Sequence, residues 1–364
     1  MKKIVALILS LCMMLSLFAV CGGVASAEEL PKMRVGLFYG DFTSKLGEQF
    51  VGCLKYLEDG LNIEIVLIEG GFGETAIATL EGVASASSVD GIISASGISP
   101  AFLKAAGGIP MIGIGSSFPS DPAEVQEVAS YENFLGCIVD SDYNAGYAAA
   151  EAMYAAGCRN LCLAGLTQGL SSAHDSRVQA VKDFIAEHPD YKLLTEDYSR
   201  AQYADAISNF AAAFPEMDSL FTSSCNDAVF TAMTTEGLIG YAKLGTIDIT
   251  ESTRDYFENG TLAYVAGGQY GSAQVALAIL LNYLYDGTRI IADTTVPMNR
   301  DYIVITSVEE FDQYLEYIDG EIPVYNADEV KAMIRAYNPD ASFESISAVN
   351  AAYSIQDVIE RHGS

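Results

Sequence analysis

The stretch that decides the fold is Phe134 to Gly157, FLGCIVDSDYNAGYAAAEAMYAAG. Its first part, Phe134 to Val139, is short and apolar, which is typical of a strand buried on both faces. Asp142 can cap a helix, the residues after it are rich in alanine, and Gly157 is placed to end that helix. The stretch therefore predicts a buried strand followed directly by a helix, the unit from which parallel sheets are built.

The same alternation of strand and helix precedes this stretch. Each expected strand is a short apolar run, and helices are expected between the runs, where apolar residues recur at helical spacing. The expected strands of this half are Met33–Tyr39, Ile63–Ile68, Gly91–Ser94 and Ile109–Ile114, with Phe134–Val139 as the fifth.

The alternation starts again after Gly157. Its expected strands are Asn160–Ala164, Tyr191–Leu194, Ser219–Thr222, Leu244–Ile247, Leu262–Ala266 and Tyr302–Thr306. Ser272 to Tyr285 is a strongly apolar helix, which we expect to be buried. Two such runs predict an α/β protein made of two doubly wound parallel-sheet lobes with a cleft between them.

This alternation, together with a family resemblance carried by three pieces of the sequence, implies the following organisation. Residues 1–27 are a signal peptide. Residues 28–138 together with 268–295 form the N-terminal lobe, and residues 139–267 together with 296–325 form the C-terminal lobe. Residues 326–364 are a helical C-terminal extension, and no role for the acidic stretch 307–364 follows from its sequence.

The N-terminus has the three parts of a secretory signal. Lys2 and Lys3 precede the apolar run Ile4–Val20, and Ala25-Ser26-Ala27 supplies a small-x-small cleavage site. We expect cleavage after Ala27 and a protein located outside the cytoplasm. Two alternatives stay open: lipidation of Cys21, although bulky Val20 fits a lipoprotein site poorly, and retention of the apolar run as a membrane anchor.

Composition narrows the function. Of the 364 residues, 48 are acidic and 19 basic, a formal net charge of −29, which argues against nucleic acid as the partner. The chain has only three histidines, so a His-rich zinc site is not expected, and it has no tryptophan, so a Trp-lined carbohydrate platform is not expected either. We expect no cofactor and no metal. After Cys21, the cysteines are odd in number and scattered, which predicts buried thiols rather than a disulfide framework: Cys53, Cys137, Cys158, Cys162 and Cys225.

No enzyme signature emerges. Ser172, His174 and Asp175 are a triad in composition only, because side chains this close in one loop do not form the nucleophile, base and orienter geometry. We therefore expect no catalytic residue.

Three pieces of the sequence, spread over roughly Met33 to Thr306, resemble the type I periplasmic binding proteins, the ribose- and galactose-binding kind. Val139–Gly146 (VDSDYNAG) resembles that family's first crossover between lobes. Leu220–Asp227 (LFTSSCND) is similar to its strand ending in Asn-Asp. Gly245–Asp248 (GTID), followed by Gly260–Ala266 (GTLAYVA), resembles the strand with a ligand aspartate and the strand that leads back. The resemblance implies a cleft that closes on a small molecule by a hinge and a closed form that docks on a membrane transporter.

The ligand should bind at the carboxyl ends of the parallel strands, as in other doubly wound folds. Polar and aromatic side chains follow the expected strands there and would pair with a small polar ligand. The candidate ligand-binding residues are Tyr39, Asp41, Phe42, Thr43, Ser96, Ser116, His174, Asp175, Arg177, Asn226, Asp248 and Gln269.

Several of these candidates have a second reading. Asn226 and Asp248 match ligand contacts of the family in type and place. Asn226 could instead cap the helix that begins near Asp227, and Asp248 the turn before Thr253. Tyr39 and Phe42 could be core residues. Arg177 and Asp175 compete for the place of a family arginine. Sugar binders tend to carry Asp-Arg where this chain has Gly115-Ser116, which puts a simple hexose or pentose in doubt.

The leading hypothesis is a monomeric, extracytoplasmic solute-binding component of an ABC-type uptake system, for a sugar or a similar small polar molecule. Its expected partners are the ligand and a transporter permease, with no nucleic acid. The alternative is a sensory protein that has the same cleft and reports to a membrane receptor or kinase.

Overall fold

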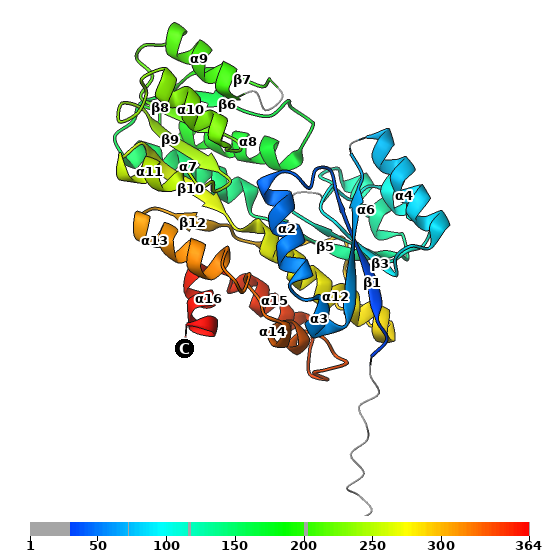
Figure 1. Ribbon diagram of the computed structural model, residues 1–364. Helices are drawn as coiled ribbons and strands as arrows, with labels where there is room; N and C mark the ends of the chain where they lie inside the picture. Colours follow the sequence, from blue (N-terminus) through cyan, green and yellow to red (C-terminus); the bar gives the residue numbers. More distant parts are fainter. Residues whose placement is uncertain (1–29, 72, 116–117, 200–202, 364) are drawn as a thin grey trace, which may run out of the picture. The chain divides into compact units, whose positions relative to one another are not determined.

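The computed structural model describes residues 30–363, apart from 72, 116–117 and 200–202, and residues 33–364 form one unit distinct from 1–32. The unit contains two six-stranded sheets (Figure 1). The first sheet has the order β11-β5-β4-β3-β1-β2, with every neighbouring pair parallel. Its strands are β1 (Met33–Tyr39), β2 (Ile63–Glu69), β3 (Gly91–Ser94), β4 (Met111–Ile114), β5 (Phe134–Asp140) and β11 (Met298–Arg300).

The second sheet repeats this topology in the order β12-β10-β9-β8-β6-β7. All of its pairs are parallel except β10 with β12, which is antiparallel. Its strands are β6 (Asn160–Ala164), β7 (Lys192–Asp197), β8 (Ser219–Thr222), β9 (Lys243–Ile247), β10 (Leu262–Gly267) and β12 (Ile303–Ile305). The prediction of two doubly wound parallel-sheet lobes is confirmed.

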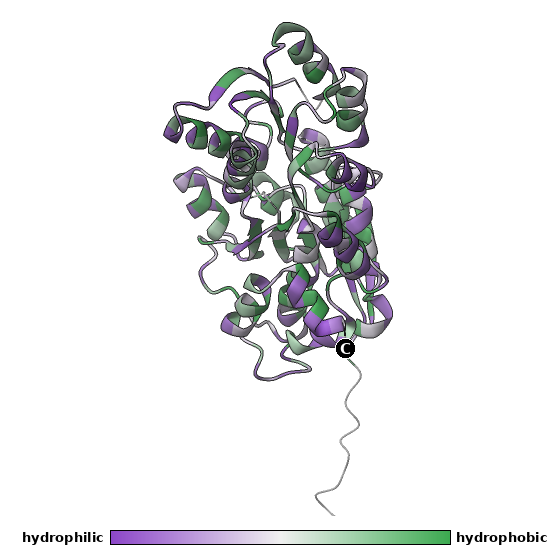
Figure 2. Cartoon of the chain, turned by 90° about the vertical axis from the view of Figure 1, so that its left-hand side faces the viewer, coloured by the Kyte–Doolittle hydropathy of each residue, from purple (hydrophilic) through white to green (hydrophobic). Residues whose placement is uncertain are grey.

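Amphipathic helices cover the sheets, and Figure 2 shows hydrophilic and hydrophobic residues alternating along them. The first lobe contains α2 (Lys45–Lys55), α3 (Glu58–Leu61), α4 (Glu74–Ala86), α5 (Pro100–Ala105), α6 (Pro122–Ala129) and α12 (Ser272–Asp286). The second contains α7 (Asp142–Ala155), α8 (Ser172–Glu187), α9 (Tyr203–Ala213), α10 (Asp227–Thr235) and α11 (Thr253–Glu258). Helix α12 is buried from Ser272 to Asn282, as its apolar sequence predicts.

The chain passes between the two sheets at three places. The first crossover joins β5 to α7, the second joins β10 to the 3-10 turn η1 (Gln269–Gly271), and the third joins β11 to β12. The first and third are tied together, because the backbone N–H of Ser141 donates to the carbonyl of Arg300 over 2.8 Å.

The third crossover corrects one predicted boundary. Residues 296–325 were all expected in the C-terminal lobe, but β11 pairs in register with β5 of the first sheet, with Arg300 opposite Asp140. Only from β12 onward does the chain belong to the second sheet. The sequence of β11, Met-Asn-Arg, has no apolar run to reveal it as a strand, and its strand partner, β5, lies about 160 residues earlier in the chain.

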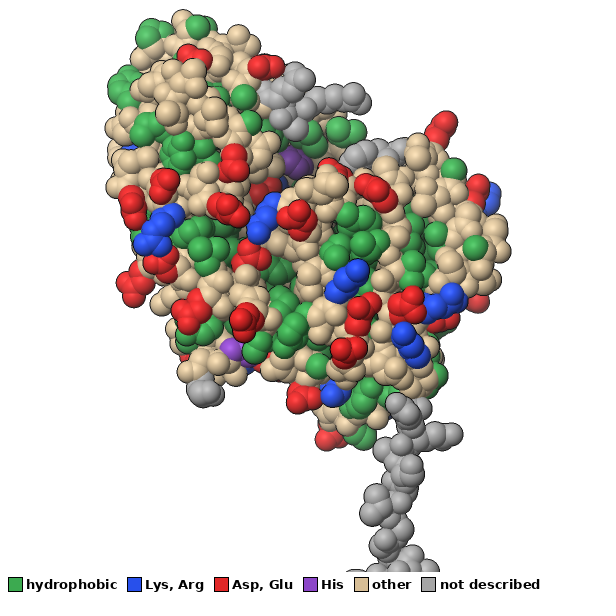
Figure 3. Space-filling model, in the orientation of Figure 1, with side chains coloured by type: hydrophobic (Ala, Val, Ile, Leu, Met, Phe, Trp, Pro, Cys, Tyr) green, Lys and Arg blue, Asp and Glu red, His purple; other side chains and the backbone are tan. Residues whose placement is uncertain are grey.

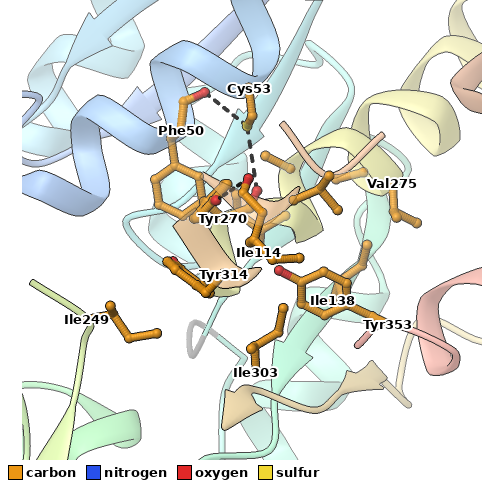
Figure 4. Close-up of a cluster of buried hydrophobic side chains, with 14 of the residues drawn as sticks. Phe50, Cys53, Ile114, Ile138, Ile249, Tyr270, Val275, Ile303, Tyr314 and Tyr353 are labelled. Atoms are coloured by element: carbon orange, nitrogen blue, oxygen red, sulfur yellow. Dashed lines mark hydrogen bonds between the residues drawn. The ribbon is translucent and has the colours of Figure 1, made fainter. Parts of the chain in front are cut away.

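The C-terminal residues pack against these crossovers. They form α13 (Val308–Gln313), the π-helical turn η2 (Tyr314–Ile318), α14 (Ala327–Ala332), α15 (Phe343–Ala351) and α16 (Ile355–His362). Tyr314 and Tyr353 join a hydrophobic cluster with Phe50 of α2, Val275 of α12 and Ile303 of β12 (Figure 4). The extension is therefore part of the core that holds both lobes and is not a separate tail.

Polar groups fix the extension as well. The hydroxyl of Tyr353 donates to the carbonyl of Gly268 over 2.6 Å, and its ring lies 3.5 Å below the guanidinium of Arg300. The amide of Asn350 donates to the carbonyl of Asn299 over 2.8 Å. Two crossovers thus receive hydrogen bonds or a cation–π contact from the extension.

We expect Tyr353→Phe to lower the free energy of unfolding by about 1 kcal/mol, because it removes one buried hydrogen bond. Tyr353→Ala should lower it by about 3–5 kcal/mol, because it also leaves a cavity under Arg300. Urea unfolding followed by circular dichroism measures both. Equal, negligible effects would mean that the extension folds independently of the crossovers.

Candidate functional site

A cavity of about 640 Å³ lies at the carboxyl ends of strands from both sheets. The first lobe contributes side chains after β1 and β3, and the second lobe contributes the N-terminal turn of α8 and the residue after β9. The crossovers supply the remaining polar groups. Its main polar lining is Tyr39, Asp41, Ser96, Glu124, Asp140, His174, Arg177, Asp248, Gln269 and Tyr302.

The structure brings most of the predicted residues to this cavity. Tyr39, Asp41, Ser96, His174, Arg177, Asp248 and Gln269 line it. Phe42, Thr43, Asp175 and Asn226 are not among its lining residues. Ser116 lies outside the described residues.

Each predicted residue that does not line the cavity has a local structural role. Thr43 donates from its N–H and its hydroxyl to Oδ1 of Asp41, over 2.8 and 2.6 Å. Phe42 packs its ring 5.9 Å from that of Tyr39. Asp175 accepts from the backbone N–H of Gly169 over 2.8 Å and so closes the loop before α8.

Asn226 is the N-cap of α10. Its side-chain oxygen accepts from the N–H of Ala228 over 3.1 Å, and the residue is exposed. The structure therefore places Asn226 in its alternative role as a helix cap.

Arg177 is the central charge of the site and is 5% exposed. Its Nε donates to Oδ1 of Asp142 over 2.7 Å, Nη1 donates to the carbonyl of Ser223 over 2.7 Å, and Nη2 donates to the hydroxyl of Tyr302 over 2.6 Å. Tyr302 in turn donates to Asp142 over 2.8 Å. Burial lowers the pKa of Arg177, but Tyr302 and Asp142 outweigh it and hold that pKa above its ordinary value.

Asp248 joins the second lobe to the second crossover. Its Oδ2 accepts from the hydroxyl of Ser224, and its Oδ1 accepts from the amide of Gln269, both over 2.7 Å. The residue has φ of 75°, a left-handed conformation that aspartate tolerates better than most side chains. That turn directs the carboxylate into the cavity at the end of β9.

Sequence comparison assigns the chain. Residues 49–252 match the model of the family described as periplasmic binding proteins and sugar binding domain of LacI family. The chain belongs to this family. No curated protein sequence matches the chain.

Solved structures of periplasmic binding proteins share the fold. A galactofuranose-binding protein superposes with a TM-score of 0.65 at 16% identity, covering 78% of this chain and 97% of that one. An Actinobacillus succinogenes solute-binding protein with bound D-allose gives 0.64 at 18%, covering 78% and 100%. An Agrobacterium vitis protein bound with α-D-tagatopyranose gives 0.62 at 17%, covering 76% and 95%. Part of this chain therefore lies outside each alignment.

Asp140 and Tyr302 are lining residues of this periplasmic-binding-protein fold that sequence reasoning missed. Both lie on crossovers, at the end of β5 and just before β12. Asp140 stands inside the VDSDYNAG stretch that carries the family resemblance, so its position at the end of a buried strand was a usable signal. Tyr302 gave none, because the sequence predicts it as the first residue of a strand, Tyr302–Thr306, whereas β12 begins at Ile303.

His174 is held as a neutral ring. Its Nδ1 lies 2.9 Å from the hydroxyl oxygen of Ser223, which also lies 3.1 Å from that of Tyr203. Burial, and secondarily the charge of Arg177, lowers the pKa of His174 to about 3. At neutral pH the His174 ring is therefore uncharged and can still form hydrogen bonds.

This shift predicts an acid sensitivity. Between pH 6.5 and 3 the unfolded chain binds a proton at His174 and the folded chain does not, so stability falls as the pH falls through that range. The variant His174→Gln has no titrating side chain at this position and so lacks this pH-dependent contribution to stability. We expect wild type to lose about 1–2 kcal/mol relative to the variant between pH 7.5 and pH 5.

Urea unfolding of both proteins at the two pH values measures this difference. A wild-type stability that moves in parallel with that of the variant would show that His174 titrates normally in the folded protein.

Proposed function

We propose that the protein is the extracytoplasmic solute-binding component of an ABC-type uptake system and captures a sugar or similar small polar molecule in the described cavity. The observation that carries the proposal is the composition of that cavity, in which Tyr39 and Ser96 of one lobe face the same space as Asp248 and Arg177 of the other. A ligand there touches both lobes, so binding favours their closure by hinge motion at the crossovers.

The cavity offers the groups that a polar ligand requires. Carboxylates, an amide and hydroxyls accept or donate hydrogen bonds, and Tyr39 supplies an aromatic ring supported by Phe50, 5.5 Å away. Capture is proposed to occur without a chemical reaction. Among the described residues no group of three or more His, Cys, Asp or Glu could hold a metal ion.

We also propose export by the N-terminal signal, residues 1–27. This segment, which includes Cys21, lies outside the described residues. No helix of the described part of the chain is long and apolar enough to cross a membrane. The proposed partner is a transporter permease that recognises the closed form.

The function is tested by a thermal-shift screen of the purified protein, from Glu28 onward, against sugars, nucleosides and amino acids. A ligand that raises the unfolding temperature should also reduce the radius of gyration in small-angle scattering, because the lobes close on it. The proposal fails if no compound in the screen binds, or if saturation with a confirmed ligand leaves the scattering unchanged.

Two variants separate a ligand contact from a cap. Asp248→Ala should weaken binding at least about tenfold, because a charge-assisted hydrogen bond is lost. Asn226→Ala should instead lower stability by about 1 kcal/mol through loss of the α10 cap and leave affinity unchanged. Isothermal titration calorimetry and urea unfolding measure the two properties. The reverse pattern would return Asn226 to the ligand site and remove Asp248 from it.

A further inference from the structure

Asp140 is a buried carboxylate whose Oδ1 has no hydrogen-bond partner among the described residues. The residue is 6% exposed, yet it lines the ligand cavity. It differs in this from Asp248, whose two oxygens accept from Ser224 and Gln269. An unpaired buried acceptor costs free energy, and one that lines a cavity is placed to accept a hydrogen bond from a ligand.

The neighbouring Arg177 donates no hydrogen bond to this carboxylate. All three nitrogens of Arg177 donate to protein groups, and its nearest carboxylate is Asp142. Asp142 takes the hydrogen bond from Arg177, so Oδ1 of Asp140 is left without a donor among the described residues. Burial and then Asp142 raise the pKa of Asp140 well above its ordinary value, which is the signature of a carboxyl group without sufficient partners.

Arg300 does not donate to Asp140 either, although the charges of Arg300 and Arg177 partly offset the rise in the pKa of Asp140. It stands opposite Asp140 in the β5–β11 register, but its guanidinium lies over Tyr353, and its Nη1 donates to Asn350 over 3.4 Å. No ion pair joins Arg300 to Asp140 within the described part of the chain.

The ionisable side chains around the cavity are mostly acidic. Its described lining includes the carboxylates of Asp41, Glu124, Asp140 and Asp248, and Arg177 is its one Lys or Arg side chain. The surface shown in Figure 3 likewise displays many more acidic side chains than Lys and Arg. A carboxylate or phosphate on the ligand would face more acidic than basic side chains here, and the hydrogen-bond donors of Arg177 are already taken by protein groups.

We propose that Asp140 determines ligand specificity: it accepts a hydrogen bond from a hydroxyl or ammonium group of the ligand and excludes ligands that carry a carboxylate or phosphate. This inference rests on the proposed function and narrows its substrate class to neutral sugars and amino sugars. Sugar acids and sugar phosphates are excluded. When the lobes close and water leaves the cavity, the donor of the ligand satisfies Oδ1, and an anionic ligand would leave two negative groups unpaired.

The test uses matched sets of sugars and calorimetry on the protein from Glu28 onward. The neutral probes are D-glucose, D-galactose, D-ribose and any other neutral sugar that binds in the proposed screen. The charged probes are the uronate, phosphate and 2-amino derivatives of each hexose. We expect neutral or amino members to bind and the anionic members to bind at least about a hundredfold more weakly. An anionic member that binds as tightly as its neutral counterpart overturns the inference.

Variants at Asp140 then identify the donor. Asp140→Ala should weaken binding of the sugar at least about tenfold. Asp140→Asn keeps an acceptor oxygen without charge, so a hydroxyl donor should lose less than about fivefold and an ammonium donor at least about tenfold. Asp301→Asn is the matched control, because it removes the same charge from an exposed residue of the third crossover outside this cavity.

Stability supplies a readout that does not depend on the ligand. Since Asp140 is unpaired when no ligand is bound, Asp140→Asn should raise the unfolding temperature of the free protein while affinity falls. Native affinity in Asp140→Ala, with a ligand confirmed by the screen, overturns the inference and leaves the proposed function intact. Absence of binding by every compound refutes the proposed function and the inference with it.

Discussion

The buried ion pair between Arg177 and Asp142 is the constraint on which the site depends. It joins the start of α7 to α8, and through Tyr302 it also reaches the third crossover. The two helices approach so closely that a Cβ at Gly146 would lie 2.2 Å from the carbonyl oxygen of Arg177. Removing either charge would leave the other buried without a partner, a cost of about 3–5 kcal/mol. The geometry of the second lobe's cavity wall therefore depends on a pair that is itself unavailable to the ligand.

The same crossovers carry two sets of interactions on opposite sides. Asp140, Gln269 and Tyr302 face the cavity, while Gly268 and Arg300 contact Tyr353 of the C-terminal extension. The amides of Gln274 and Asn282, on the otherwise apolar α12, donate to the carbonyls of Tyr325 and Met333. These hydrogen bonds explain why an apolar helix carries two fully buried amides. They also make the extension part of the structure that any motion of the lobes has to bend.

The sequence predicted the sheets well because short apolar runs and glycine stops are local signals. It could not predict β11, whose Met-Asn-Arg sequence is a strand only because β5 lies beside it. The same difference separates the site residues. Tyr39, Ser96 and Asp248 were found because they follow recognisable strands, whereas Asn226 follows one equally well and is directed to a cap by the helix after it. Asp140 was missed because its unpaired oxygen depends on Arg177 donating to other groups and on Arg300 not donating to it, which is a property of the folded chain alone.

Burial has opposite consequences for the ionisable groups around this cavity. It keeps His174 neutral by lowering its pKa, and it raises the pKa of Asp140 by penalising the carboxylate. Arg177 stays charged because Asp142 and Tyr302 pair with it directly. Of these groups, only Asp140 lacks a hydrogen-bond partner for a buried side-chain atom within the described residues. A hydrogen bond from the ligand to Oδ1 of Asp140 therefore contributes most to binding, because no hydrogen bond within the protein has to break first. A hydrogen bond to Arg177 contributes least, because the existing hydrogen bonds of Arg177 would have to break.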